Sequence, residues 1–268
     1  MSSVAFPSDG AEGMGAEAQY QIFCRAWAHM NNKEYTFTPF KNIEHYQHTG
    51  VTQEEFCNDV NKLFQFDKAP LPSKSSEWLN TPSLKWYWQN HIDSLYPFLK
   101  DQVLFLDEDK KYFNAEEINV AMHVRVRTKL DPCSDPAREY FDVSGKLDPN
   151  IYYANIISRI KRCYPNKNVS FHIYSQGSPE DFKFFHEMDD NVYMHIEEYP
   201  PISVYHMANA DVLVMANSSF SYVAHLYGKC FTIARDSFYH RLYENTSVRA
   251  DINGIFDEEK LLNYEKYY

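Results

Sequence analysis

The sequence lacks the signatures of several common classes of protein. Its five cysteines are widely spaced and include no Cys-X-X-Cys pair, so we expect reduced thiols and neither a metal cluster nor a disulfide framework. There is no Gly-X-Ser-X-Gly of a nucleophilic hydrolase and no complete Gly-X-Gly-X-X-Gly of a dehydrogenase. No apolar run is long enough to cross a bilayer. These absences predict a soluble, cytoplasmic protein without a membrane span.

An excess of basic residues is also missing. The chain of 268 residues has 26 Lys and Arg against 37 Asp and Glu, which gives a formal charge of −11. Such a charge argues against a general nucleic-acid or anionic-membrane binder, so an anionic ligand would need a local basic pocket. The length allows one large domain or two lobes of ordinary size.

The most informative segment is a short apolar strand followed by a turn rich in hydroxyl groups. The strand covers 212–215, and the turn that follows contains Asn217, Ser218, Ser219 and Ser221. Open α/β sheets bind ligands at this end of their strands, and a helix N-terminus there favours an anion such as phosphate. With no glycine-rich loop or Walker lysine, the turn is not a P-loop. It predicts a diphosphate site made of hydroxyls and main-chain amides; the alternative is a helix N-cap alone.

Two further strand-like runs end in polar residues. Residues 118–125 end in His123 and Arg125, and residues 169–177 contain Ser175 and Gln176 at their end. Three such strand ends in order along the chain fit one edge of a nucleotide-binding sheet.

Together these motifs resemble the fucosyltransferase superfamily that carries a His-X-Arg-Arg motif. The matching residues are His123-Val124-Arg125, Tyr174-Ser175-Gln176 and Asn217-Ser218-Ser219-Phe220-Ser221, and the similarity covers roughly 116–235. The resemblance implies an α/β chain with the GT-B arrangement, in which two Rossmann-like lobes with parallel sheets face a central cleft. It also implies a nucleotide-sugar donor on the second lobe and an oligosaccharide or glycoprotein glycan acceptor on the first.

The sequence departs from the family pattern after Arg125. Val126 stands where the second arginine is expected, and Arg127 follows on the same side of a continuing strand as Arg125. The family implies GDP-fucose as the donor, but this departure leaves UDP-xylose as an alternative. An enzyme of this type without a membrane anchor would suit a large algal virus that builds glycans in the cytosol of its host.

The order of elements predicts where the lobes meet. We expect an acceptor-side lobe over 1–112, a donor lobe over 113–256 and a helical tail over 257–268, with the boundary near a charged run at 107–111. In the first lobe, Gly13 and Gly15 would lie in a loop before a helix at 21–30.

Several other elements follow from periodicity. A strand is expected at 34–39, a helix with a Thr52–Glu55 capping box comes next, and 69–82 reads as a loop. In the donor lobe we also expect helices at 152–162, 179–188 and 202–209, and a strand at 231–234.

The site residues can be given roles. The guanidinium of Arg125 would stabilise the charge that develops on the departing β-phosphate, and His123 would hydrogen-bond the sugar or phosphate, or be a buried histidine only. The remaining donor-site candidates are Arg127, Ser175, Gln176, Ser218, Ser219, Phe220, Ser221 and Arg235, the last of which could equally be a surface charge.

Inverting transfer needs a base for the acceptor hydroxyl, unless the departing phosphate takes the proton. Glu12, Glu17, His29 and His45 are candidates, and Glu17 is preferred because it follows the glycines. The run 107–109 has the letters of an Asp-X-Asp metal motif, but its context is that of a solvated loop. We therefore expect no metal or other cofactor. The alternative function is a non-catalytic glycan- or nucleotide-binding protein on the same fold.

Overall fold

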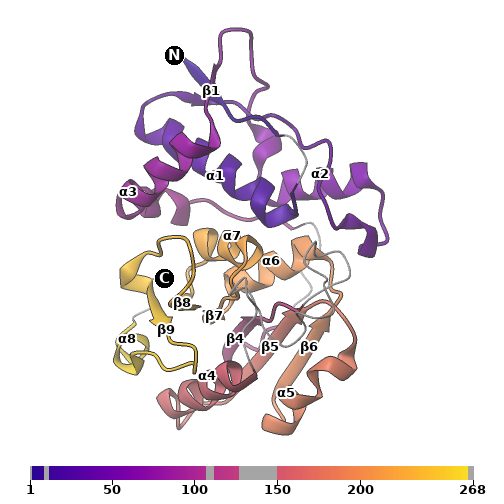
Figure 1. Cartoon of the computed structure of the whole chain (residues 1–268), viewed down its shortest axis with the longest axis vertical. Coiled ribbons are helices and arrows are strands. Elements are labelled where there is room, and N and C mark those ends of the chain that lie inside the picture. The colour runs from indigo at the N-terminus through magenta and orange to yellow at the C-terminus, as the bar shows by residue number, and fades with distance from the viewer. Residues whose placement is uncertain (1, 9–11, 107–111, 127–149, 265–268) are drawn as a thin grey trace, which may run out of the picture.

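The computed structural model describes residues 2–8, 12–106, 112–126 and 150–264. The chain forms two Rossmann-like lobes, each a parallel sheet with helices packed on it, and both lobes line one cleft (Figure 1). The predicted α/β class with two parallel-sheet lobes is confirmed. The motifs at 107–111 and Arg127 lie outside the described residues.

The first lobe is built on a small sheet with the strand order β2-β1-β3. Its elements are β1 (Ser3–Ala5), α1 (Met14–Met30), β2 (Glu34–Tyr35), α2 (Gln53–Leu63), β3 (Glu77–Trp78) and α3 (Thr81–Lys100), with 3-10 turns η1 (Tyr46–His48) and η2 (Phe66–Lys68). The predicted capping box begins α2: Thr52 Oγ accepts from the Glu55 N–H at 3.2 Å, and Glu55 Oε2 accepts from the Thr52 N–H at 2.9 Å.

Three boundaries in this lobe differ from the predictions. Helix α1 begins at Met14, so Gly15 lies inside the helix and Gly13 is its N-cap, rather than both lying in a loop. Strand β2 has two residues instead of six. Helix α3 starts inside the expected loop because Asn80 caps it, its Oδ1 accepting from the Ser83 N–H at 3.0 Å.

The second lobe has a six-stranded parallel sheet in the order β6-β5-β4-β7-β8-β9. Its strands are β4 (Ile118–His123), β5 (Val169–Ser175), β6 (Val192–Ile196), β7 (Val212–Val214), β8 (Phe231–Arg235) and β9 (Ser247–Ala250). Its helices are α4 (Asn150–Cys163), α5 (Lys183–Met188), α6 (Pro200–Asn209), α7 (Ser219–Tyr227) and α8 (Glu258–Leu262), with 3-10 turns η4 (Pro179–Phe182) and η5 (Glu244–Thr246). The outer strands β6 and β9 were not predicted. No helix in the described ranges is both long and apolar enough to cross a membrane.

Each face of the large sheet belongs to a different hydrophobic core. Met122 and Ile173 join the core that packs against α4 and α5, whereas Ala121 and Tyr174 point to the opposite face. On that face α6 and α7 lie between the sheet and the first lobe (Figure 1). Their core continues without a break into the first lobe as far as Val4, so the two lobes share one core.

Polar contacts also cross between the lobes. The buried Trp88 indole donates to the Tyr222 hydroxyl at 2.6 Å, and His240 Nε2 lies 3.1 Å from Gln19 Oε1. The Arg241 guanidinium donates to Asp93 at 2.7 Å. These contacts hold α1 and α3 of the first lobe against the helix α7 and the segment after β8.

Candidate active site

The candidate site lies where the strand order of the large sheet reverses. In chain order the strands of this lobe are arranged 3-2-1-4-5-6, and the first and fourth strands, β4 and β7, are neighbours. The chain leaves these two strands in opposite directions, which opens a crevice at their carboxyl ends. His123 ends β4 and Ser218 follows β7, so the predicted motifs meet at this crevice.

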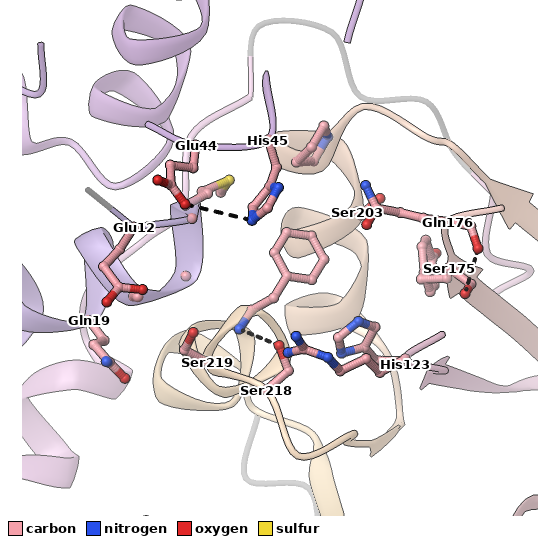
Figure 2. A pocket seen from close by; sticks show the side chains of 18 of the residues that line it. Glu12, Gln19, Glu44, His45, His123, Ser175, Gln176, Ser203, Ser218 and Ser219 are labelled. Carbon is pink, nitrogen blue, oxygen red and sulfur yellow. Dashed lines mark hydrogen bonds and ion pairs between the residues drawn. The ribbon is translucent and has the colours of Figure 1, made fainter. Parts of the chain in front are cut away.

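A cavity of about 450 Å³ occupies this crevice and extends to the first lobe. Its size suits a nucleotide-sized ligand, since ligand pockets typically range over about 300–1,000 Å³. Figure 2 shows side chains of the first lobe, Glu12, Glu44 and His45, on one side, and His123, Ser218 and Ser219 of the second lobe on the other.

The start of α7 forms one wall of the cavity. Ser218 is the N-cap, and its Oγ accepts from the Phe220 N–H at 3.2 Å. Ser219, the first residue of the helix, lines the cavity together with Tyr239. The predicted alternative of a helix cap therefore applies to the Ser218 side chain, while Ser219 and the helix terminus face the cavity.

The start of α1 meets the start of α7 at the same place. Gly13 caps α1 without a side chain, and residues 13–16 line the cavity. Gly15 lies so close to α7 that a Cβ on it would be 2.4 Å from the Phe220 nitrogen. The positive ends of a helix of 17 residues and one of 9 residues thus converge, which makes the crevice attractive to an anion.

Arg125 and His123 add a fixed charge and a neutral ring. Arg125 is half-buried and lines the cavity just beyond β4. His123 is buried, its Nδ1 lies 3.0 Å from Ser221 Oγ, and its ring meets Phe220 edge-on at 5.3 Å. Burial, and then the charge of Arg125, lower the pKa of His123 to about 3. The imidazole is therefore neutral at physiological pH.

The wall from the first lobe is acidic. The Glu44 N–H donates to the Glu12 carbonyl at 3.0 Å, next to a parallel bridge between Gly13 and Glu44. This pairing brings Glu12, Glu44 and His45 to one edge of the cavity. Tyr239 lies between the two walls: burial, the largest effect, raises its pKa, the charge of Arg125 lowers it, and the charge of Glu12 raises it.

The far end of the cavity is polar and belongs to the second lobe. Ser175 Oγ donates to the Val124 carbonyl at 2.6 Å, which ties the end of β5 to the end of β4. Gln176 and Ser203 line the cavity beside it. The Glu198 carboxylate also lines it and accepts from the Tyr112 hydroxyl at 2.7 Å.

The structure brings most of the predicted site residues to this cavity. Those that line it are Gly13, Gly15, His123, Arg125, Ser175, Gln176, Ser218, Ser219 and Phe220. Of the base candidates, Glu12 and His45 line it, whereas the exposed His29 stacks on Phe98 at 4.0 Å near the other end of α1.

Besides His29, three predicted residues in the described part of the chain do not line the cavity. Glu17 is buried on another face of α1 from Gly15 and Gln19 and accepts from the Ser8 hydroxyl at 3.2 Å, so the loop position predicted for it is wrong. Ser221 is buried behind His123. Arg235 points to the opposite sheet face, where its guanidinium lies 5.8 Å from the centre of the Tyr152 ring.

Sequence reasoning missed several lining residues. They come from helices or from loops without a recognisable motif, and they are Gln19, Glu44, Glu198, Ser203 and Tyr239. Of these residues, only Gln19 could have been predicted from the sequence. It follows Gly15 by four residues, and residues four apart share a helix face.

Comparison with known proteins gives a weak likeness in structure only. No family model matches the sequence, and no curated protein matches it. The fucosyltransferase NodZ from Bradyrhizobium is similar at a TM-score of 0.40 and 11% identity, over 85% of this chain and 93% of that one. The heptosyltransferase WaaC of E. coli, solved with ADP, is similar at a TM-score of 0.46 and 8% identity, over 94% of each chain. A likeness of this strength does not define the chemistry, which rests on the cavity itself.

Proposed function

We propose that the protein is an inverting glycosyltransferase that moves a sugar from a nucleotide-diphosphate donor to a hydroxyl of a glycan acceptor. The observation that carries the proposal is the convergence of two helix N-termini and Arg125 at the switch point of the large sheet. A diphosphate is the ligand class that matches this concentration of positive potential in a protein of charge −11. The acidic wall opposite suits a neutral acceptor and a base.

In this proposal the diphosphate lies against the starts of α1 and α7, within reach of Arg125. When the bond between the anomeric carbon and the β-phosphate oxygen breaks, its electron pair goes to the diphosphate. The guanidinium can contact two oxygens and stabilise this charge more strongly as it grows. The Ser219 hydroxyl and main-chain amides at the helix starts add hydrogen bonds.

His123 acts in this scheme as a hydrogen-bonding group. Its low pKa keeps it uncharged, so it does not duplicate the role of Arg125. Ser221 fixes the ring through Nδ1, which leaves the other ring nitrogen to meet the donor. Ser221, predicted as a phosphate ligand, thus supports the site from behind.

The polar far end of the cavity would hold the nucleoside. Ser175, Gln176 and Glu198 offer a hydroxyl, an amide and a carboxylate there, which suit ribose hydroxyls and base edges. GDP-fucose is the proposed donor and UDP-xylose the alternative. We further propose that transfer needs no metal ion, because Arg125 and the helix N-termini supply the positive potential that a cation would otherwise provide.

A binding screen followed by a turnover assay tests the proposal. Thermal shift is measured with GDP, UDP, GDP-fucose and UDP-xylose, since a ligand at 100 times its Kd adds about 2.7 kcal/mol of stability. Release of nucleoside diphosphate and transfer of labelled sugar are then followed with and without EDTA. Binding with turnover that survives EDTA supports the proposal. No binding overturns it; binding without turnover indicates the non-catalytic alternative; loss of turnover with EDTA, restored by Mn²⁺, overturns metal independence.

A further inference from the structure

One pocket residue of the first lobe, His45, is held in an unusual way. It follows β2 in a loop, lines the cavity and keeps 45% of its side chain exposed. Figure 2 shows its ring directed into the space between the acidic wall and the start of α7. An accessible imidazole inside a ligand cavity is a common general base, because it can take and return a proton near neutral pH.

The backbone of His45 lies in the left-handed region, with φ 66° and ψ 17°. This conformation costs free energy for a residue with a side chain and persists only where the surroundings impose it. The contacts that hold the loop in this conformation are made by the preceding residue, because the backbone of Glu44 pairs with Glu12 and Gly13. This backbone conformation directs the His45 side chain to the cavity. Strained backbone conformations of this kind cluster at functional sites in proteins.

Gly13 provides the space for this ring. A Cβ on Gly13 would lie 3.3 Å from His45 Cδ2, closer than side chains normally approach. The φ of Gly13 is −69°, which any residue adopts, so the backbone itself does not require glycine there. The imidazole therefore packs over the bare N-cap of α1, beside the proposed diphosphate position.

His45 also has an acidic partner. Its Nε2 lies 4.0 Å from Glu44 Oε2. A carboxylate at this range stabilises the imidazolium that forms when the ring accepts a proton. Among the described residues that line the cavity, the other charged groups are Glu12 on the same wall, Arg125 opposite and Glu198 at the far end.

We propose that His45 is the general base of the transfer, with Glu44 stabilising its charged form; this inference rests on the proposed function. The imidazole takes the proton of the acceptor hydroxyl as that oxygen bonds to the anomeric carbon. The bond to the β-phosphate oxygen breaks at the same time, and its electron pair leaves with the nucleoside diphosphate. The proton then passes from the imidazolium to water.

The test uses the full chain and whichever nucleotide sugar the screen finds to be a donor, with its hydrolysis by water as the reaction. His45→Asn removes the base and keeps a residue that tolerates the left-handed backbone. We expect the rate to fall by about 10²–10⁴-fold, with the affinity for nucleoside diphosphate unchanged by calorimetry. His29→Gln is the matched control and should keep full activity, because His29 lies in the same lobe as His45 but outside the cavity.

A second variant tests the role given to Glu44. Glu44→Gln keeps the imidazole and removes the charge that stabilises its protonated form, so turnover should fall by less than in His45→Asn, with the affinity for nucleoside diphosphate unchanged. His45→Asn activity within threefold of the parent would overturn the assignment and point to Glu12. Failure of the parent to bind any nucleotide would instead reject the proposed function.

Discussion

Gly15 of the first lobe and Phe220 of the second are in direct backbone contact. A Cβ on Gly15 would fall 2.4 Å from the Phe220 nitrogen, and because the atom it meets is backbone, no side-chain rotation relieves the overlap. We predict that Gly15→Ala forces α1 and α7 apart and destabilises the protein by about 1–3 kcal/mol, the usual cost of overpacking. The affinity for nucleoside diphosphate should fall as well, because the two helix starts no longer meet.

Gly13→Ala is the matched control for this change. Its Cβ would meet only the edge of the His45 ring at 3.3 Å, so the loss of stability should be smaller. Thermal unfolding and calorimetric titration of both variants check the prediction. A Gly15→Ala protein with the melting temperature and ligand affinity of the parent would mean that the lobes separate easily.

Arg125→Ala should abolish transfer and leave the fold intact. The side chain is half-buried at the cavity, so its loss removes charge at the leaving group without opening the core. By analogy with other fixed charge sites, the barrier should rise by about 3–4 kcal/mol, which is a factor of about 160 to 900 in rate. Turnover and circular dichroism are compared with Arg162→Ala, which removes an exposed guanidinium paired with Glu258. Activity of Arg125→Ala within threefold of the parent would remove it from the mechanism.

Ser219 and Ser218 should behave differently although they are adjacent. Ser219 faces the cavity, so Ser219→Ala should weaken nucleoside diphosphate binding with little change in stability. Ser218 caps α7, so Ser218→Ala should lower the free energy of unfolding by about 1 kcal/mol. Titration calorimetry and urea unfolding of both variants separate the two roles. If Ser219→Ala keeps the donor affinity and loses stability instead, the turn is only a helix cap.

Buried histidines predict a loss of stability on mild acidification. His172 Nδ1 lies 3.0 Å from His195 Nε2, and burial lowers the pKa of His172 to about 3 and that of His195 to about 4. The unfolded chain therefore binds protons below about pH 6.5 while the folded chain does not. Each histidine then lowers the free energy of unfolding by at most about 1.4 kcal/mol per pH unit, as the pH falls toward its pKa in the folded protein.

Urea unfolding at several values between pH 7 and pH 5 measures this slope. In that range the carboxyl groups remain largely ionised, so histidines dominate the change. His172→Phe, which keeps a ring able to stack on Tyr193, should reduce the slope. A free energy of unfolding that stays constant over this range would show that the histidines are not held neutral.

The sequence predicted the site best where polar residues directly follow apolar strands. The ends of β4, β5 and β7 were found in this way, because parallel strands place their carboxyl ends at one edge. The predictions for Glu17 and Arg235 were wrong. The Glu17 side chain lies on another face of its helix, and the Arg235 side chain lies on the other face of the sheet. Which face a side chain takes depends on the exact start of its helix or strand. The prediction of α1 seven residues too late was enough to misplace Glu17.

Other parts of the site could not have been predicted. Glu44 comes to the cavity because its loop pairs with residue 12, a contact between residues far apart in sequence that no local pattern records. The edge strands β6 and β9 contain both apolar and polar residues. Residues such as His195 and Arg249 are not typical of a buried strand. Only the order of the whole sheet gives them their place.

The core shared by the two lobes affects how the protein could be altered. The first lobe has strands of only two or three residues, and its apolar side chains pack on α6 and α7 as part of one continuous core. It is therefore not a module that can be exchanged for another lobe to change the acceptor, because the cut would run through the hydrophobic interior. Changes to the cavity would have to be made at lining positions such as Glu12 and His45, and not at their neighbours Phe40 and Ile43, which belong to the core.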